Sequence, residues 1–259
     1  MKSTPQIQLF EGDCLEIMKR IPADSVDAIL CDLPYGSTKC RWDTVIPFSL
    51  LWEQYKRIRK EAGVTVLFGN ELFSSSLRLS NVHEYRYDWY WQKDKAANFW
   101  FGNRMPLKTV EVISVFYAKQ PTYNPQKEIN PKGPSKRHLG PNPSKISSHV
   151  REVMGSSWKE TLLDTTQNYH GKTYEPDKLL PKQLIYFSRD QRGRIHPTQK
   201  PVALMEYLIR TYTNEGDVVL DNCMGSGTTG VACRKLNRSF IGIEQNAEYF
   251  NQAKNRIFS

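Results

Sequence analysis

A glycine-rich loop near the carboxyl end of the chain limits the available folds more than any other feature. Gly225, Gly227 and Gly230 follow G-x-G-x-x-G spacing between the apolar run VVLD and the helical pattern GTTGVACRKLN. Glycines let the backbone approach a ligand closely, and the amino terminus of the following helix favours negative charge. Glu244 ends the next strand pattern, FIGIE, where its carboxylate can accept hydrogen bonds from both hydroxyls of a ribose. The pattern therefore predicts a strand, loop and helix that bind a nucleoside-containing ligand.

The position of this loop separates two folds that both use it. A dinucleotide-binding domain that opened at residue 216 would need several more βα units, but only one strand and one helix follow before Ser259. A circularly permuted sheet, in which the nucleoside-binding half comes last, needs no further units. We therefore favour the permuted arrangement, and a packing turn without a ligand is the alternative.

The rest of the chain divides into a regular and an irregular part. Residues 1–119 alternate between strand patterns such as VDAILCD and helical patterns such as FSLLWEQYKRIRKEA, which indicates a mostly parallel sheet with helices on its faces. The pattern lapses from 121 to 194, where six prolines between 121 and 150 exclude regular helix and central strand. We therefore expect three segments, 1–120, 121–194 and 195–259.

Positive charge gathers in the irregular part. Residues 121–200 hold 14 Lys/Arg against 7 Asp/Glu, while the whole chain has a net charge of +9. Aromatic residues lie among these cations: Trp158, Tyr169, Tyr174, Tyr186 and Phe187. Interleaved aromatic and basic residues favour a folded insertion that meets nucleic acid, and a flexible linker is the alternative.

Length and composition exclude several other classes of protein. A chain of 259 residues fits one large α/β domain with an insertion. No apolar run approaches the ~20 residues of a membrane span, and the amino terminus MKSTPQIQLF lacks a signal-peptide pattern, so we expect a cytoplasmic location. The five cysteines, odd in number and without C-x-x-C pairs, predict free thiols and no metal site.

Four residues directly after the apolar strand pattern at 26–31 stand out. Asp32, Leu33, Pro34 and Tyr35 place a carboxylate, a rigid proline and an aromatic ring at the carboxyl end of a predicted strand. Pro34 stiffens this loop and holds Leu33 in an extended conformation. A type II turn with Pro34 near its second position is the alternative.

Together with the late glycine loop, these four residues resemble the β group of amino-methylating DNA methyltransferases, whose hallmark is D-P-P-Y for adenine. The resemblance covers most of the chain outside 121–194. It includes GDCLEIM at 12–18, HPTQKPVALMEYLI at 196–209, DNCMGSGTTG at 221–230 and IGIEQNAEYFNQAKNRI at 241–257. Leu33 departs from the usual proline, and Asn222 and Cys223 stand where the family usually has proline and an aromatic residue.

The resemblance implies a Rossmann-like methyltransferase fold that depends on S-adenosylmethionine. Its sheet is expected to be circularly permuted, mixed and seven-stranded, with helices on both faces. Residues 1–120 are then the catalytic half, 195–259 the cofactor-binding half, and 121–194 an inserted target-recognition region that reads bases in the major groove. Double-stranded DNA is the implied partner, restriction-modification is the implied setting, and a homodimer is compatible with the group.

The implied reaction is methylation of the N6 amine of adenine. Such an amine is a poor nucleophile because its lone pair is delocalised into the ring. If Asp32 and the carbonyl oxygen of Leu33 each accept one N–H bond, the lone pair can turn toward the methyl sulfonium. Tyr35 can stack on the base once it is flipped out of the duplex. The alternatives are the N4 amine of cytosine, an RNA or protein amide substrate, and a DNA-binding protein of this fold without activity.

The resemblance also assigns roles to further residues. Those expected to bind the cofactor are Asp13, Cys14, Asp32, His196, Thr198, Lys200, Asp221, Gly225, Gly227, Thr228 and Glu244. Those expected to contact DNA are Lys39, Arg41, Trp42, Lys93 and Arg104, the last two in a connection that could cover the flipped base. The alternatives are a solvated loop at 39–42 and an ordinary connection between strands around Lys93 and Arg104. Lys200 is expected to hold the carboxylate of the methyl donor. The alternatives are a helix cap at position 13, an exposed lysine at 200 and a structural histidine at 196.

Overall fold

A computed structural model describes residues 5–37, 43–96, 98–133, 175, 177–189 and 199–259. The chain divides into two compact units, a main unit of Met1–Gln126 with Lys182–Ser259 and a small unit of Lys127–Pro181. Among the described residues, no helix combines the length and the apolar character needed to cross a bilayer.

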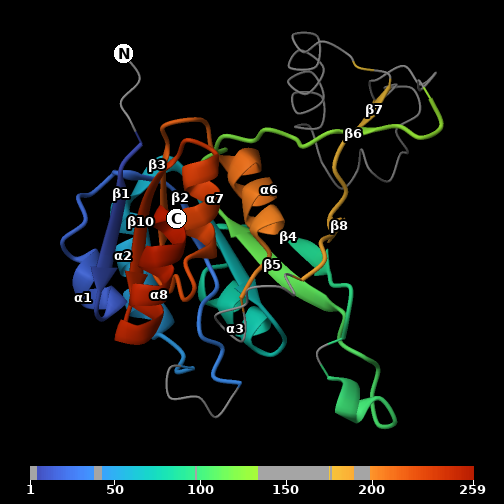
Figure 1. The fold of residues 1–259 in the computed structure, drawn as a ribbon, viewed down its shortest axis with the longest axis horizontal. Coiled ribbons are helices and arrows are strands. Elements are labelled where there is room, and N and C mark those ends of the chain that lie inside the picture. The colour runs from blue at the N-terminus through green and yellow to red at the C-terminus, as the bar shows by residue number, and fades with distance from the viewer. Residues whose placement is uncertain (1–4, 38–42, 97, 134–174, 176, 190–198) are drawn as a thin grey trace, which may run out of the picture. The chain divides into compact units, whose positions relative to one another are not determined.

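The main unit is built on a sheet with the strand order β1-β10-β9-β2-β3-β5-β4-β8 (Figure 1). Its strands are β1 (Ile7–Glu11), β2 (Val26–Cys31), β3 (Arg59–Gly69), β4 (Tyr85–Gln92), β5 (Val110–Phe116), β8 (Leu184–Tyr186), β9 (Val218–Asp221) and β10 (Ser239–Glu244). Within these described strands, β5 alone runs antiparallel to its neighbours. The sheet is mixed, as predicted, and has the short edge strand β8 in addition to the seven strands expected.

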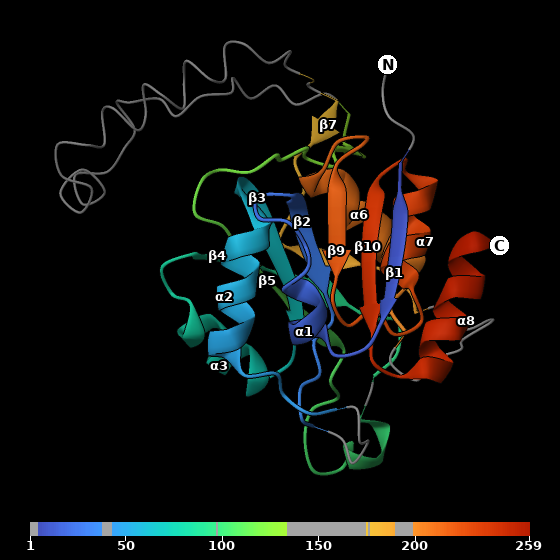
Figure 2. The same ribbon diagram turned by 90° about the vertical axis from the view of Figure 1, so that its left-hand side faces the viewer.

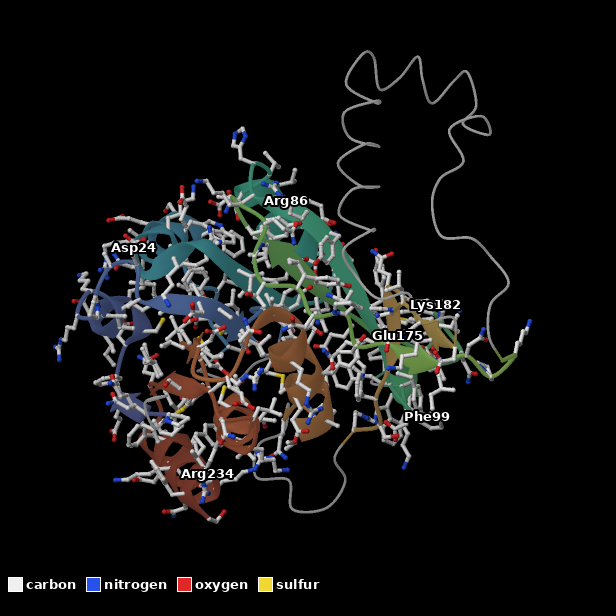
Figure 3. The ribbon with its side chains drawn as sticks, turned by 90° about the horizontal axis from the view of Figure 1, so that it is seen from above. Asp24, Arg86, Phe99, Glu175, Lys182 and Arg234 are labelled. Atoms are coloured by element: carbon white, nitrogen blue, oxygen red, sulfur yellow. The ribbon has the colours of Figure 1, made fainter. Side chains whose placement is uncertain are left out.

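Helices cover both faces of the sheet (Figure 2). One face carries α1 (Cys14–Met18), α2 (Phe48–Ile58) and α3 (Phe73–Ser80), and the other carries α6 (Val202–Tyr212), α7 (Thr228–Lys235) and α8 (Ala247–Phe258). Figure 3 shows the side chains from above, with Arg86 near the start of β4 and Phe99 in the helical turn η1 (Phe99–Phe101) that follows that strand.

The central strand β2 contributes to the cores on both faces. Ala28 and Leu30 pack with residues of α6, α7 and α8, whereas Ile29 and Cys31 pack with residues of α1, α2 and α3. Successive side chains of a strand point to opposite faces, so a strand covered on both faces reads as a continuous apolar run. The sequence VDAILC therefore becomes a buried strand that ends directly before Asp32.

Two elements differ from the sequence prediction. The predicted helix at 48–62 ends at Ile58, and β3 begins at Arg59, which pairs with Val26. The sequence patterns also gave no helix at 73–80, but α3 forms there with Phe73 and Leu77 buried. In both places, packing and strand pairing outweigh local helix propensity.

The last strands of the chain lie in the middle of the sheet. β9 and β10 lie between β1 and β2. The last two strands of the chain and the first two therefore form one half of the sheet. Because β9 and β2 are parallel, their carboxyl ends meet at the same edge. The residues after β2 and the glycine loop after β9 are therefore spatial neighbours, although most of the chain separates them in sequence.

The small unit has its own short pairing. In its described part, β6 (Glu128–Ile129) pairs antiparallel with β7 (Lys178–Leu179). Glu175 forms ion pairs of 2.5 Å with Lys127 and with Lys178. The bounds of this unit lie inside the predicted segment 121–194, whereas residues 121–126 and 182–194 belong to the main unit.

Candidate functional site

The carboxyl edge of the main sheet holds a cavity of about 1040 Å³. Its wall includes residues 32–35 after β2, residues 221–226 after β9, and Glu244 at the end of β10. Lys200, which precedes α6, also lines it. The two segments that the sequence singled out therefore open onto one cavity, whose volume is large for a single small-molecule site.

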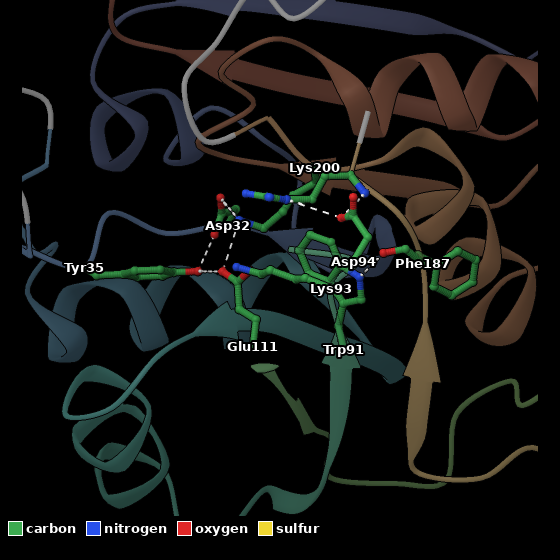
Figure 4. Close-up of polar contacts among 9 residues, drawn as sticks. Asp32, Tyr35, Trp91, Lys93, Asp94, Glu111, Phe187 and Lys200 are labelled. Atoms are coloured by element: carbon green, nitrogen blue, oxygen red, sulfur yellow. Dashed lines mark hydrogen bonds and ion pairs between the residues drawn. The ribbon is translucent and has the colours of Figure 1, made fainter. Parts of the chain in front are cut away.

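Asp32 is held in this cavity by two donors (Figure 4). The hydroxyl of Tyr35 donates to Oδ1 over 2.5 Å, and the ammonium of Lys200 donates to Oδ2 over the same distance. The side chain of Lys200 is 8% exposed. The carboxylate of Asp32 is therefore fixed in orientation at the end of β2.

A second carboxylate, that of Glu111 in β5, lies beside Asp32. Its Oε1 is 3.3 Å from Lys200 Nζ and 3.2 Å from the hydroxyl of Tyr35. Its Oε2 pairs with Lys93 over 2.8 Å. Two acids and two lysines thus form a network whose formal charges cancel. The sequence reasoning missed Glu111, and the signal it overlooked is an acidic residue inside the apolar strand VEVISVF.

The network determines the protonation of its members. Burial raises the pKa of Asp32, and Lys200 opposes part of that rise. Burial also acts on Glu111, but Lys200 and Lys93 outweigh it and hold the pKa of Glu111 below its ordinary value. For Lys200, burial acts to lower the pKa, but Asp32 and Glu111 outweigh it and raise the pKa. Lys200 is therefore an ammonium at neutral pH.

The glycine loop positions Glu244. Gly225 has a φ of 49° and Gly227 a φ of 72°, left-handed conformations that side chains disfavour. The N–H of Gly225 donates to Glu244 Oε2 over 2.9 Å, and the N–H of Asn246 donates to Oε1 over 2.8 Å. The backbone of Gln245 also interacts with this carboxylate, which has four lone pairs in all and so keeps acceptor capacity for a ligand.

Asp221 holds the beginning of the glycine loop. Its carboxylate accepts the hydroxyl of Thr229 over 2.6 Å and the N–H of Cys223 over 3.2 Å. The residue is 3% exposed, and burial raises the pKa of its carboxyl group to about 7. Asp221 therefore joins the end of β9 to the first turn of α7.

Asp13 and Cys14 lie on the cavity wall at the start of α1. Asp13 is the N-cap of this helix, because its Oδ1 accepts the N–H groups of Leu15 and Glu16 over 2.9 and 3.1 Å. Asp13 therefore caps the helix, which is the alternative role expected from the sequence. The cap does not exclude a ligand contact, since Asp13 also faces the cavity.

Two predicted cofactor residues of the glycine loop have protein partners. Thr228 is buried on the cavity wall, and its hydroxyl accepts a hydrogen bond from Arg256 over 2.9 Å. Gly227 faces α8, where an added Cβ would lie 2.9 Å from Ile257 Cδ1 and 3.0 Å from Ala253 Cβ. Gly227 therefore allows close packing of the loop on α8.

The residues predicted to contact DNA are found in different places. Lys39, Arg41 and Trp42, like the cofactor candidates His196 and Thr198, lie outside the described residues. Arg104 is exposed in the connection between β4 and β5. Lys93 begins the same connection, but it pairs with Glu111 and its side chain is only 16% exposed. Its partner in the structure is therefore the network around Asp32.

Known proteins are similar to this chain in sequence and in fold. The family model described as DNA methylase (N6_N4_Mtase) matches residues 26–255. The type II methyltransferase M.HpaI of Haemophilus parainfluenzae is 27% identical over 265 residues, which cover 97% of this chain and 74% of M.HpaI. The DNA adenine methyltransferase YhdJ of Escherichia coli (strain K12) is 28% identical over 273 residues, which cover 96% of this chain and 82% of YhdJ.

A solved structure supports the same comparison. The crystal structure of the M1.HpyAVI–SAM complex superposes with a TM-score of 0.63 at 27% identity, over 97% of this chain and 99% of that one. The similarity therefore extends over nearly the full length of both chains. It confirms the Rossmann-like fold class predicted from the sequence.

Proposed function

The chain belongs to the DNA methylase family, and from this premise we propose that it transfers a methyl group from S-adenosylmethionine to the N6 amine of adenine in double-stranded DNA. The observation that carries the proposal is the meeting of residues 32–35 and the glycine loop in one cavity. The tetrapeptide resembles the adenine motif, and YhdJ, a DNA adenine methyltransferase, matches 96% of the chain. The order of the sheet, with β9 and β10 between β1 and β2, supports assignment to the permuted β group.

The cavity fits S-adenosylmethionine, which supplies an electrophilic methyl group on a sulfonium. Glu244 lines the cavity with a carboxylate that can accept hydrogen bonds from ribose hydroxyls. Asp13 and Asp221 add carboxyl groups to the same wall. Gly225 brings the backbone of the loop to the wall without a side chain. These residues are proposed to hold the cofactor, with Thr228 and Cys14 completing the surface.

Asp32 is proposed to orient the target amine. Its carboxylate and the carbonyl oxygen of Leu33 would each accept one N–H bond, which directs the nitrogen lone pair away from the ring system. No covalent intermediate on the protein is required, so positioning and electrostatics account for the acceleration. Leucine at position 33 can serve, because the proposed contact is made by the main chain.

Tyr35 is proposed to stack on the flipped adenine. A base in a duplex is out of reach of such a cavity and must be extruded. The ring of Tyr35 packs against Phe73 with 4.9 Å between centroids, and its hydroxyl is bonded to Asp32. The ring is therefore held in place before a base arrives, which reduces the cost of ordering it.

Sequence recognition is proposed to reside in the insertion, within the predicted range 121–194. The main unit would then carry out methyl transfer, and the insertion would determine which DNA sequence is methylated. A homodimer stays a proposal, because the group to which the chain is assigned allows one.

The proposed function is tested by nucleoside mass spectrometry of DNA from cells that express the protein, with the Asp32→Ala variant as control. N6-methyladenine that appears with the parent and not with the variant is the expected result. N4-methylcytosine would instead identify the cytosine alternative. The absence of both modified bases would contradict the proposal.

A further inference from the structure

Both donors that hold Asp32 are shared with Glu111 (Figure 4). The hydroxyl of Tyr35 lies 2.5 Å from Asp32 Oδ1 and 3.2 Å from Glu111 Oε1. Lys200 Nζ lies 2.5 Å from Asp32 Oδ2 and 3.3 Å from Glu111 Oε1. A small rotation of the side chain of Tyr35 or Lys200 would therefore change its hydrogen-bond partner from Asp32 to Glu111.

The observed arrangement conflicts with the task of Asp32 in methyl transfer. Each of its oxygens already accepts one short hydrogen bond, so an incoming amine must share the carboxylate with Tyr35 and with the ammonium of Lys200. The amine also gains positive charge as it attacks a sulfonium. A lysine ammonium bound to the same carboxylate opposes that charge.

Lys200 can release Asp32 either by moving to another partner or by losing its proton, and the structure favours movement. Lys200 is buried, and Asp32 and Glu111 favour its charged form. Its Nζ lies 5.1 Å from the ring centroid of Phe68, so the side chain is enclosed. Glu111 Oε2 is occupied by Lys93, whereas Oε1 is within reach of both shared donors. The nearest alternative partner for Lys200 is therefore Glu111.

We propose that Glu111 is a positioning residue that draws Lys200 and Tyr35 away from Asp32 when the target amine enters the cavity. This inference rests on the proposed function. In the free protein, Lys200 takes the place of the amine and keeps Asp32 ionised and oriented. When the base is bound, Lys200 and Tyr35 bond to Glu111, and Asp32 presents both oxygens to the amine without a bound ammonium.

The first test is Glu111→Gln, which preserves size and an acceptor oxygen but removes the charge that attracts Lys200. Under single-turnover conditions with saturating cofactor and duplex, the rate constant of methyl transfer should fall by about tenfold or more. The dissociation constants of cofactor and duplex should stay within about threefold, since Glu111 only acts through Asp32. Glu206→Gln is the matched control, because Glu206 of α6 also pairs with two cations, Arg210 and Lys235, but does not line the cavity.

The decisive test adds Lys200→Met to Glu111→Gln. It is measured near pH ~9, because high pH favours the ionised form of Asp32 when its lysine partner is absent. The double variant should transfer methyl groups about fivefold faster than Glu111→Gln alone, because the competitor for Asp32 is gone. A merely structural role for Glu111 predicts a double variant that is no faster. That result, or a Glu111→Gln variant as fast as the parent, overturns the exchange and leaves the proposed function intact.

If Glu111→Gln does not fold, the single variant Lys200→Met tests the proposed change of hydrogen-bond partners. Without Lys200, burial leaves the pKa of Asp32 further raised, so the methyl-transfer rate of Lys200→Met should rise between pH ~6 and pH ~9 more steeply than that of the parent. An equal loss at both pH values overturns the exchange. A parent protein that methylates no DNA amine at all overturns the proposed function and the exchange together.

Discussion

At the scale of single residues, a substitution of Asp32 should slow methyl transfer without weakening the binding of the duplex. Asp32→Ala removes the side-chain acceptor for the amine but leaves Glu244 and the glycine loop unchanged. The rate constant of methyl transfer should fall by about 100-fold or more, whereas duplex binding should change little. Single-turnover assays and duplex binding by fluorescence anisotropy measure the two effects. A variant that loses both equally would show that Asp32 serves the structure of the cavity.

Asp221 provides a prediction for stability. Burial raises the pKa of its carboxyl group from 3.8 to about 7. A folded pKa above the unfolded one means that the folded protein binds the proton more tightly. The resulting stabilisation is complete below pH ~4 and is lost as the pH rises toward ~7. Between pH ~5 and ~8, the parent should lose roughly 2 to 3 kcal/mol of unfolding free energy that Asp221→Asn does not lose.

Urea denaturation of parent and variant at the two pH values measures this difference. Other titrating groups are common to both proteins, so their contributions cancel in the comparison. Equal pH dependence in the two proteins would show that Asp221 is ionised in the folded state at neutral pH.

These residues also show what the sequence could predict about the site. Asp32 and Glu244 each end a strand pattern and lie beside a recognisable motif, so local sequence was sufficient to find them. Glu111 could not be assigned, because its partners reach it only through the order of the sheet. Lys200 was predicted to bind the carboxylate of the cofactor. In the structure, Lys200 pairs with Asp32, from which it is far removed in the sequence.

At the scale of elements, the connection between β4 and β5 presents aromatic rings to solvent. Phe99 is 73% exposed and Trp100 is 92% exposed. The connection is ordered by Asn98, whose side chain donates to the carbonyl of Pro106 and accepts the N–H of Lys108. Its base joins the network around Asp32 through Lys93. We therefore expect the tip to contact the duplex next to the flipped base.

Removal of the exposed ring tests this expectation. Trp100→Ala should weaken duplex binding and slow base flipping by about fivefold or more, because a stacked ring contributes roughly 1 to 3 kcal/mol per base. Fluorescence of 2-aminopurine at the target position reports flipping. Phe258→Ala is the matched control, because Phe258 is 54% exposed at the end of α8. Equal behaviour of both variants would assign the aromatic tip to another partner.

Short and weakly patterned elements were the ones that sequence patterns missed. α3 has the sequence FSSSLRLS, whose four serines disfavour a helix, and it is held by the burial of Phe73 and Leu77. β8 has only the three residues LIY and gains its place by pairing with β4. The strands β2, β9 and β10 were predictable because burial on both faces makes their central residues largely apolar.

At the scale of the whole molecule, the distribution of charge differs from the simplest interpretation of the sequence. The small unit, 127–181, holds 9 Lys/Arg and 6 Asp/Glu, whereas residues 182–200 hold 5 Lys/Arg and 1 Asp. Much of the positive surplus of the irregular segment therefore belongs to the main unit. A basic main unit suits contacts to the DNA backbone, which bind without reading sequence.

This division leads to a prediction about specificity. The cavity and the network around Asp32 belong entirely to the main unit, so exchange of 127–181 for the corresponding segment of M.HpaI should leave the chemistry intact. The chimera should methylate the same type of amine at a different DNA sequence, because base contacts specify and phosphate contacts only position. Methylation-sensitive long-read sequencing of DNA from cells that express parent or chimera reports base and motif together. A folded chimera that still modifies the motif of the parent would place recognition in the main unit, where residues 182–200 supply the cations.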